Sequence, residues 1–199
     1  MLTRSRLIRR GFFGEPDTLK HTQALYFNKS PYTVFKVISD IDKYKEFIPW
    51  CTSSYTYNKK ENSIASSITI GYAPLTLTYI ANVDFEFPHK IHSASNKNSV
   101  FDLHESLWQF YPDGQCLKSN DLIVPVDKTR AMYSISFRFT STMVQSFTQL
   151  VFDQVIKETA NAFQKHINSL KEDEPCFYNK QTKTYYKTKE ECITADIQT

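Results

Sequence analysis

The sequence predicts an α+β protein in which a curved antiparallel β-sheet wraps around one long C-terminal α-helix. From residue 141 to residue 170, apolar side chains recur at helical spacing, and neither Gly nor Pro interrupts them. Between residues 53 and 140, runs rich in branched and aromatic residues alternate with turn-forming residues, as is typical of antiparallel strands. The chain also has 15 Phe and 12 Tyr against 4 Gly, enough bulky apolar material to fill a core and line a cavity.

Residues 1–14 have the composition of a mitochondrial import presequence. They contain Arg4, Arg6, Arg9 and Arg10, several apolar residues and no acid, a combination that predicts an amphipathic helix removed after import. A disordered basic arm is the alternative. These arginines alone exceed the formal net charge of +3, so the rest of the chain is close to neutral. A nucleic-acid-binding function is therefore disfavoured, because such proteins carry their basic excess on the folded surface.

After the presequence, a first strand is expected over residues 19–28, followed by two short helices. Ser30-Pro31 favours a helix start, because Ser supplies an N-cap acceptor and Pro at the first helical position lacks only an amide that would be unpaired. A second helix is expected over residues 40–47, and Pro49 prevents its continuation. We expect these helices and the Pro49-Trp50 corner to form a lid over a cavity.

The middle of the chain is expected to form an antiparallel meander. Its predicted strands are Ser53–Asn58, Ile64–Tyr72, Leu75–Phe87, Ile91–Ser95, Ser99–Tyr111, Gln115–Lys118 and Met132–Thr140. In the last strand every second residue from Tyr133 to Phe139 is apolar, so the long helix should cover that face of the sheet. Residues 120–130 contain Pro125 and are expected to form a loop at the mouth of the cavity.

The long helix should extend for roughly 42 Å at ~1.5 Å per residue, which is enough to cross the whole sheet. Ser141 or Thr142 is expected to cap its first amides. Beyond residue 170 the chain mixes lysines with acids and shows no apolar periodicity, which predicts a polar, disordered tail. The expected organisation is a presequence at 1–14, one domain at 15–170 and a tail at 171–199.

The sequence carries no motif of a known catalytic or metal centre. Patterns for nucleophile elbows, zinc proteases, P-loops and dinucleotide binding are absent, and the four cysteines lack metal-ligand spacing, so no metal site is expected. His104 and Glu105 adjoin each other on a predicted strand. A catalytic activity that disappears when either residue is substituted would favour an enzyme. No apolar run is long enough to cross a membrane, so membrane contact is expected to be peripheral.

Several segments resemble the mitochondrial coenzyme Q-binding protein family, a START-like group of the polyketide cyclase superfamily. They are SPYTVFKVISDIDKYKEFIPWC, IGYAPLTLTYIANV, LWQFYP and FRFTSTMVQSFTQLVF followed by AFQKH, and YKEFIPWC is the most distinctive string. The resemblance covers roughly residues 12–168. It implies a START-like helix-grip fold around an apolar tunnel that holds ubiquinone, and a non-enzymatic role, without a cofactor, in respiratory electron transport and ubiquinone biosynthesis. Two positions depart from the family pattern, Gly71-Tyr72 and Lys165-His166, and are not assigned to the site.

The resemblance also implies a set of ligand-binding residues at the corner, on the central and last strands, and on the long helix. By motif position they are Tyr44, Phe47, Ile48, Pro49, Trp50, Trp108, Phe110, Phe139, Phe147, Val151 and Phe152. The implied partners are ubiquinone or a polyisoprenoid precursor, the matrix side of the mitochondrial inner membrane, and enzymes of ubiquinone biosynthesis, with no nucleic acid.

Two other functions remain open from the sequence. The first is an enzyme of the cyclase or hydrolase type that acts on an aromatic or polyketide substrate in the same tunnel. The second is an interaction module that docks on biosynthetic enzymes and whose cavity is vestigial.

Overall fold

The computed structural model describes residues 18–72, 75–95 and 101–197, and its largest element is a curved antiparallel sheet. The predicted presequence at 1–14 lies outside the described residues. The strand order across the sheet is β1 (Leu19–Phe27), β8 (Thr129–Phe139), β6 (Phe101–Pro112), β5 (Lys90–Ser95), β4 (Leu75–Glu86), β3 (Ser63–Tyr72) and β2 (Cys51–Tyr57). From β2 to β6 each strand pairs with the next in the chain, which confirms the meander.

The strands of the main sheet that come first and last in the chain, β1 and β8, pair with each other although they are far apart in the sequence. β1 pairs with β8 along its whole length, and β8 pairs with β6 on its other side. The predicted strand at Gln115–Lys118 is wrong, because residues 116–118 form the 3-10 helix η2 (Cys116–Lys118) in the connection between β6 and β8. The Lys118 amide donates to the Gln115 carbonyl, three residues earlier, at 3.2 Å, which is the hydrogen bond of a 3-10 turn.

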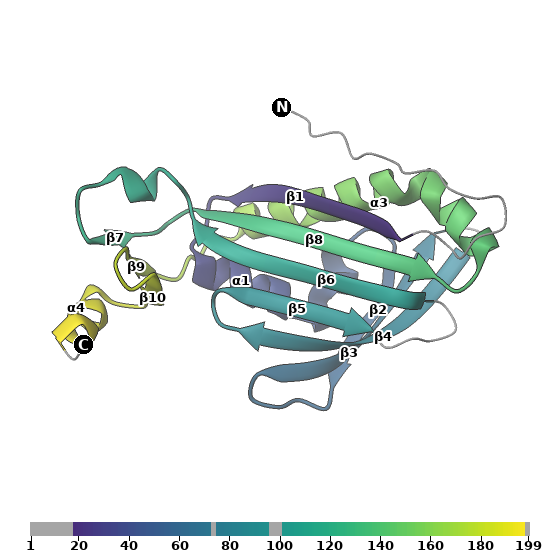
Figure 1. Ribbon diagram of the computed structural model, residues 1–199, viewed down its shortest axis with the longest axis horizontal. Coiled ribbons are helices and arrows are strands. Elements are labelled where there is room, and N and C mark those ends of the chain that lie inside the picture. The colour runs from purple at the N-terminus through teal and green to yellow at the C-terminus, as the bar shows by residue number, and fades with distance from the viewer. Residues whose placement is uncertain (1–17, 73–74, 96–100, 198–199) are drawn as a thin grey trace.

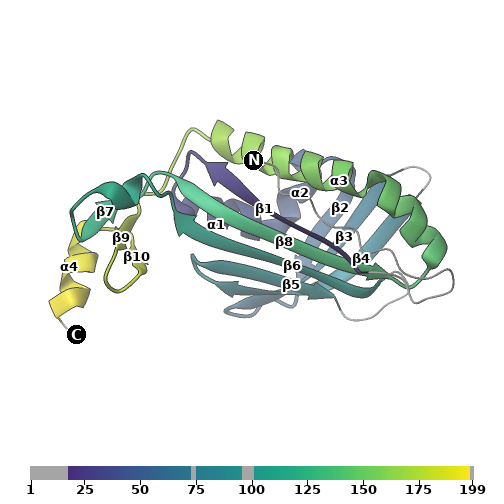
Figure 2. The same cartoon turned by 45° about the horizontal axis from the view of Figure 1, so that its top comes forward.

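A single helix, α3 (Thr142–Ser169), lies along one face of the sheet (Figures 1 and 2). Its N-cap is Ser141, whose side chain accepts a hydrogen bond from the Val144 amide. α3 contacts β1 and β8, and Phe163 and Ile167 on its apolar stripe are almost fully buried. The alternation of β8 and the periodicity of α3 therefore meet at one interface, as predicted.

Two short helices and a 3-10 turn cover the rest of this face. In α1 (Pro31–Ser39), Ser30 is the N-cap and accepts from the Thr33 amide, as its sequence predicts. The turn η1 (Ile41–Lys43) and the helix α2 (Tyr44–Phe47) then lead to the Pro49-Trp50 corner. Asp42 holds this segment on β2, because its carboxylate accepts from the Thr56 amide at 2.6 Å and from the Thr56 hydroxyl at 2.8 Å.

The expectation of a disordered tail is wrong for the described residues beyond 170. The tail forms β9 (Phe177–Asn179), β10 (Thr184–Tyr186) and α4 (Lys189–Ile197), and its two strands build a small sheet with β7 (Ile123–Pro125), in the order β10-β9-β7. Figure 1 shows this unit at one end of the main sheet. The segment 120–130, expected to be a loop at the cavity mouth, thus contains a strand that pairs with the tail.

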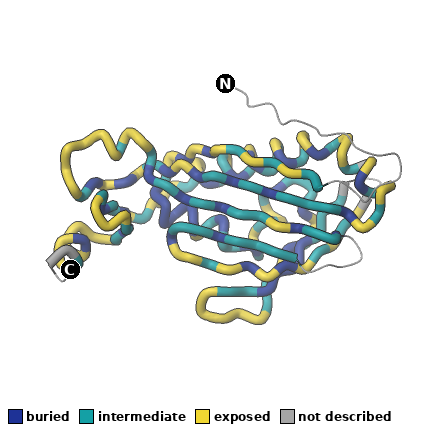
Figure 3. Tube along the Cα trace, viewed as in Figure 1, coloured by how far each residue is buried: buried dark blue, intermediate teal, exposed yellow. Residues whose placement is uncertain are grey.

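The tail has its own small apolar core, separate from that of the main sheet. Cys176 and Tyr185 pack with Tyr32, Val124 and Val126, and all five side chains are buried. Buried positions therefore appear inside an otherwise exposed unit (Figure 3). These partners lie in α1, in β7 and directly after β7, and each tail strand has only three residues, so no periodicity in the tail itself could have predicted its folding.

Asp173 ties the start of the tail to α1. Its carboxylate accepts from the Ser30 amide, at 3.0 and 3.1 Å, and from the Thr33 hydroxyl at 2.6 Å. A carboxylate at this position also interacts favourably with the helix dipole. The described helices include none that is long and apolar enough to cross a membrane.

Candidate functional site

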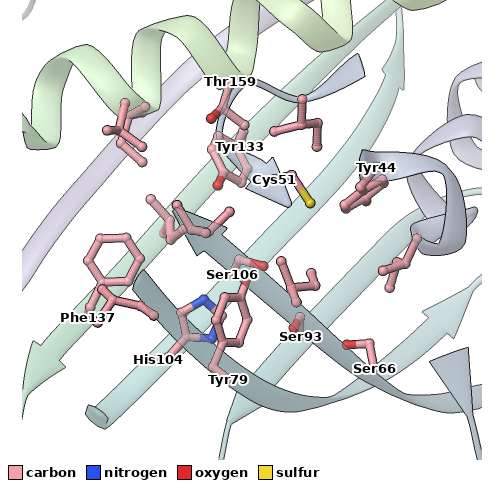
Figure 4. A pocket seen from close by; sticks show the side chains of 18 of the residues that line it. Tyr44, Cys51, Ser66, Tyr79, Ser93, His104, Ser106, Tyr133, Phe137 and Thr159 are labelled. Atoms are coloured by element: carbon pink, nitrogen blue, oxygen red, sulfur yellow. The ribbon is translucent and has the colours of Figure 1, made fainter. Parts of the chain in front are cut away.

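A cavity of about 210 Å³ lies between the inner face of the sheet and α3 (Figure 4). Side chains from β3, β4, β5, β6 and β8 form one wall, α3 forms the opposite wall, and α1, η1 and α2 close one side. The lining is mostly aliphatic and aromatic, which is typical of sites for hydrophobic ligands. None of the described lining residues is Asp, Glu, Lys or Arg.

The structure brings six of the predicted site residues together at this cavity. They are Tyr44, Ile48, Trp108, Phe139, Val151 and Phe152. Phe110 is not among the lining residues. It is two positions from Trp108 on the same face of β6, but it packs edge-on to Phe35 of α1, with ring centres 5.7 Å apart, and is 2% exposed. Phe110 is therefore a core residue beneath α1.

The rest of the predicted corner lies outside the cavity lining. Phe47 stacks on His166 of α3 with ring centres 4.1 Å apart and meets Phe163 edge-on at 5.3 Å. Pro49 and Trp50 are half-buried, and Trp50 has a left-handed backbone (φ 61°) with its carbonyl accepting from the Gly71 amide at 2.9 Å. The corner is thus fastened to both α3 and β3. Phe147 lies on α3, and its side chain is outside the described part of the structure.

The cavity also contains polar side chains that the motif comparison did not single out. Those labelled in Figure 4 besides Tyr44 are Cys51, Ser66, Tyr79, Ser93, His104, Ser106, Tyr133 and Thr159. Most come from the sheet, where inward-facing residues recur at every second position. That alternation identified Tyr133 as an inward residue of β8, but only the position of the other strands relative to α3 places Tyr79 and Ser93 in the cavity.

His104 and Glu105, adjacent in the sequence, face opposite sides of the sheet. His104 lines the cavity, whereas Glu105 lies on the outer face within 2.8 Å of His92 Nε2. Glu105 therefore does not orient the His104 ring. Its ring centre lies 4.3 Å from that of Tyr79 and 5.7 Å from that of Phe137, which is nearly parallel to it.

Burial keeps the titratable groups of the cavity uncharged at neutral pH. His104 is 4% exposed, and desolvation lowers its pKa to about 4. Burial raises the pKa of Tyr44, Tyr79 and Tyr133 above the ordinary tyrosine value. Because burying a charge without a partner is costly, these groups stay neutral, and the cavity suits a neutral ligand with a few oxygen atoms. Within the described ranges no cluster of three metal-ligating side chains occurs.

A curved sheet that holds a long helix over an uncharged apolar cavity defines the START-like, helix-grip class of proteins. The chain belongs to the polyketide cyclase / dehydrase and lipid transport family, whose model matches residues 28–164. The Zhui aromatase/cyclase from Streptomyces sp. R1128 has the same fold, with a TM-score of 0.62 and 10% sequence identity over 76% of this chain and 94% of that chain.

Curated relatives confirm the resemblance to the mitochondrial coenzyme Q-binding proteins. The chain is 22% identical over 147 residues to Coenzyme Q-binding protein COQ10 homolog B, mitochondrial, of Xenopus laevis, covering 74% of this chain and 57% of the relative. It is 26% identical over 173 residues to Coenzyme Q-binding protein COQ10, mitochondrial, of Saccharomyces cerevisiae, covering 79% and 78%. The chain thus spans little more than half the length of the frog protein.

Proposed function

We propose that this protein binds coenzyme Q, or a hydrophobic precursor of it, in the cavity between the sheet and α3, and carries it without catalysis and without a cofactor. The observation that carries this proposal is an uncharged, mostly apolar cavity in a chain whose relatives are named for coenzyme Q binding. The proposed location is the mitochondrion, on the matrix side of the inner membrane. Support of respiratory electron transport and delivery to enzymes of ubiquinone biosynthesis would follow from such a carrier.

The size of the cavity bears on which part of the ligand it encloses. An apolar cavity of ~150 Å³ is known to take a benzene ring. The cavity here, at about 210 Å³, therefore has room for one substituted ring and the first carbons of a tail. A long polyisoprenoid tail would extend beyond it, along α3 or into a bilayer.

The energetics favour weak, exchangeable binding. Moving an isoprene unit from water into an apolar site is worth at most roughly 4 kcal/mol, at ~0.8 kcal/mol per carbon. Ubiquinone, however, begins in a bilayer, where its tail is already surrounded by hydrocarbon. Transfer to the protein thus gains little from tail burial and depends on packing and hydrogen bonds at the ring.

The face of α3 that carries Met143 and Leu150 is the part of the protein that we propose touches the membrane. These side chains are 81% and 83% exposed, and because the two positions are seven residues apart, about two helical turns, they lie on one side of the helix. Thr148 and Val151, from the same turns of α3, line the cavity. A ligand leaving beside this half of α3 would pass directly into the lipid. The corner at Phe47 is a weaker candidate, because Phe47 is packed against α3.

Identification of the bound lipid tests the proposal. The protein, purified from a quinone-producing host without detergent, should release a quinone or a prenylated aromatic precursor on solvent extraction and mass analysis. A matched sample of an unrelated protein from the same host gives the background. Extraction of phospholipid alone, or failure of the emptied protein to take up a short-tail quinone, would contradict the proposal.

Catalysis on an aromatic or polyketide substrate is the second candidate. Its support is the imidazole of His104 inside the cavity of a fold shared with an aromatase/cyclase. Incubation with aromatic polyketide substrates should give turnover that His104→Phe abolishes if this candidate is right. If the substrate remains unchanged and a quinone is recovered from the purified protein, the enzyme is excluded in favour of the carrier.

A further inference from the structure

Some polar atoms of the cavity have hydrogen-bond partners within the protein and others have none. This difference distinguishes structural groups from those that can face a ligand. The Tyr44 hydroxyl donates to the Ile38 carbonyl, and the Ser66 hydroxyl donates to the Ala81 carbonyl at 3.3 Å. By contrast, His104 Nδ1 and Thr148 Oγ1 are buried and have no hydrogen-bond partner. Buried polar groups without partners are rare in folded proteins, so each requires an explanation.

These two unpartnered groups enter the cavity from opposite walls. His104 projects from β6 in the sheet, and Thr148 belongs to α3. Phe137 connects the two regions, since its ring stacks on His104 and meets Phe152, one helical turn after Thr148, edge-on at 5.3 Å. A ligand seated here would therefore meet a polar atom on either side and aromatic rings along its edges.

The surroundings of His104 match a flat ring that carries oxygen atoms. Tyr79, Phe101 and Phe137 all lie within 5.7 Å of the imidazole, centre to centre. Ser106 is two residues further along β6 and also faces the cavity, and Ser93 is directly opposite it on β5. This wall thus combines ring surfaces with hydroxyl groups, whereas Phe152, Ile156 and Phe163 make the helix wall mostly apolar.

We propose that His104 and Thr148 form a head-group subsite that hydrogen-bonds oxygen atoms on opposite sides of a neutral quinone or hydroquinone ring. This inference rests on the proposed function and specifies which part of the ligand the cavity recognises. The para oxygens of such a ring point in opposite directions, as do the walls that carry the two side chains. The tail then leaves beside the exposed face of α3.

The chemistry of the two groups also predicts what the subsite accepts and rejects. A neutral imidazole has one donor and one acceptor, and a hydroxyl has both, so each can pair with a quinone carbonyl or with a hydroquinone hydroxyl. Oxidised and reduced rings are therefore both bound. A phosphate-bearing head group is rejected, because the described lining offers no cation to offset its buried charge.

Binding of ring and tail probes to matched variants tests the subsite. The probes are a quinone with one isoprene unit and an isoprenoid alcohol with no ring, both titrated into delipidated protein and followed by calorimetry. His104→Phe keeps an aromatic ring beside Tyr79 and Phe137 but removes the polar atoms. His92→Phe is the matched control, because it makes the same replacement on the outer face of the sheet.

We expect His104→Phe to weaken quinone binding about tenfold, the effect of one buried hydrogen bond, and to leave binding of the alcohol within about twofold. His104→Gln, which keeps a donor and an acceptor, should recover most of the loss, and His92→Phe should match the wild type for both probes. Thr148→Val, close in shape to threonine, should weaken quinone binding by several-fold.

The outcomes separate this inference from the proposed function. If the wild type binds the quinone and neither His104→Phe nor Thr148→Val weakens that binding, the subsite is overturned and the proposed carrier function still stands. No quinone binding by the wild type would overturn the proposed function as well. If His104→Phe does not fold, the wild type is compared with a ring analogue lacking both oxygens. Equal affinity for the analogue and the quinone would overturn the subsite, and about tenfold weaker binding of the analogue would support it.

Discussion

The burial of His104 should make the stability of the empty protein depend on pH in a way that one substitution removes. The folded state holds the pKa of His104 near 4, whereas the ordinary value is 6.5. Between these values the unfolded chain binds a proton at this site that the folded protein does not. Stability is therefore highest above pH 6.5 and falls as the pH drops toward 4.

The size of this effect follows from the two pKa values. Each unit of difference corresponds to ~1.36 kcal/mol, so the whole contribution of His104 is about 3 kcal/mol, lost completely only below pH 4. Between pH 7 and pH 5 the loss is about 2 kcal/mol. Because folded domains have only ~5–15 kcal/mol of stability, such a loss is readily measured.

Urea unfolding of the wild type and His104→Phe at pH 7, 6 and 5 is the appropriate assay. Other histidines and carboxylates contribute to both proteins, so the difference in unfolding free energy between them isolates position 104. We expect that difference to shift by about 2 kcal/mol in favour of the variant as the pH falls from 7 to 5. Parallel pH profiles would refute the reasoning, since they would mean that His104 is protonated as easily in the folded protein as in the unfolded chain.

Three further predictions concern the tail, the membrane-facing helix and the corner. Asp173→Ala should lower stability by about 1 kcal/mol, seen as a fall of ~2–4 °C in Tm, because the Ser30 amide and the Thr33 hydroxyl lose their carboxylate acceptor. Glu172→Ala should change little. The double substitution Met143→Ser/Leu150→Ser should slow quinone exchange with vesicles and leave the equilibrium distribution of the quinone nearly unchanged. The control is Leu122→Ser, at an exposed leucine beside β7. Equal slowing by the double variant and the control would contradict membrane contact through this face of α3. Phe47→Ala should lower the unfolding free energy measured in urea by roughly 2 kcal/mol, less than for a fully buried Phe, because the stacking on His166 and the edge-on contact with Phe163 are lost. Unchanged stability together with slowed quinone exchange would instead favour Phe47 as a membrane contact.

Local patterns were sufficient wherever neighbouring residues in the chain carry the signal. The length of α3 follows from 28 residues of uninterrupted helical spacing, and its cap from Ser141. The start of α1 follows from Ser30-Pro31, and the inward face of β8 from its alternation. The helix-grip arrangement could be predicted from these elements, because a long apolar stripe and a one-sided sheet have to bury each other.

The contents of the cavity depend on contacts between distant parts of the chain. Trp108 and Phe110 have the same orientation on β6, but the rings of α1 cover only Phe110, so one lines the cavity and the other is core. His104 and Glu105 are adjacent in β6 and therefore point to opposite faces of the sheet. The register of β6 with its neighbours decides which of the two side chains faces the cavity. The tail folds because Cys176 and Tyr185 find partners near β7 and on α1, far away in the sequence. Periodicity reports the face that an element buries, whereas the neighbour that covers that face is set by long-range packing.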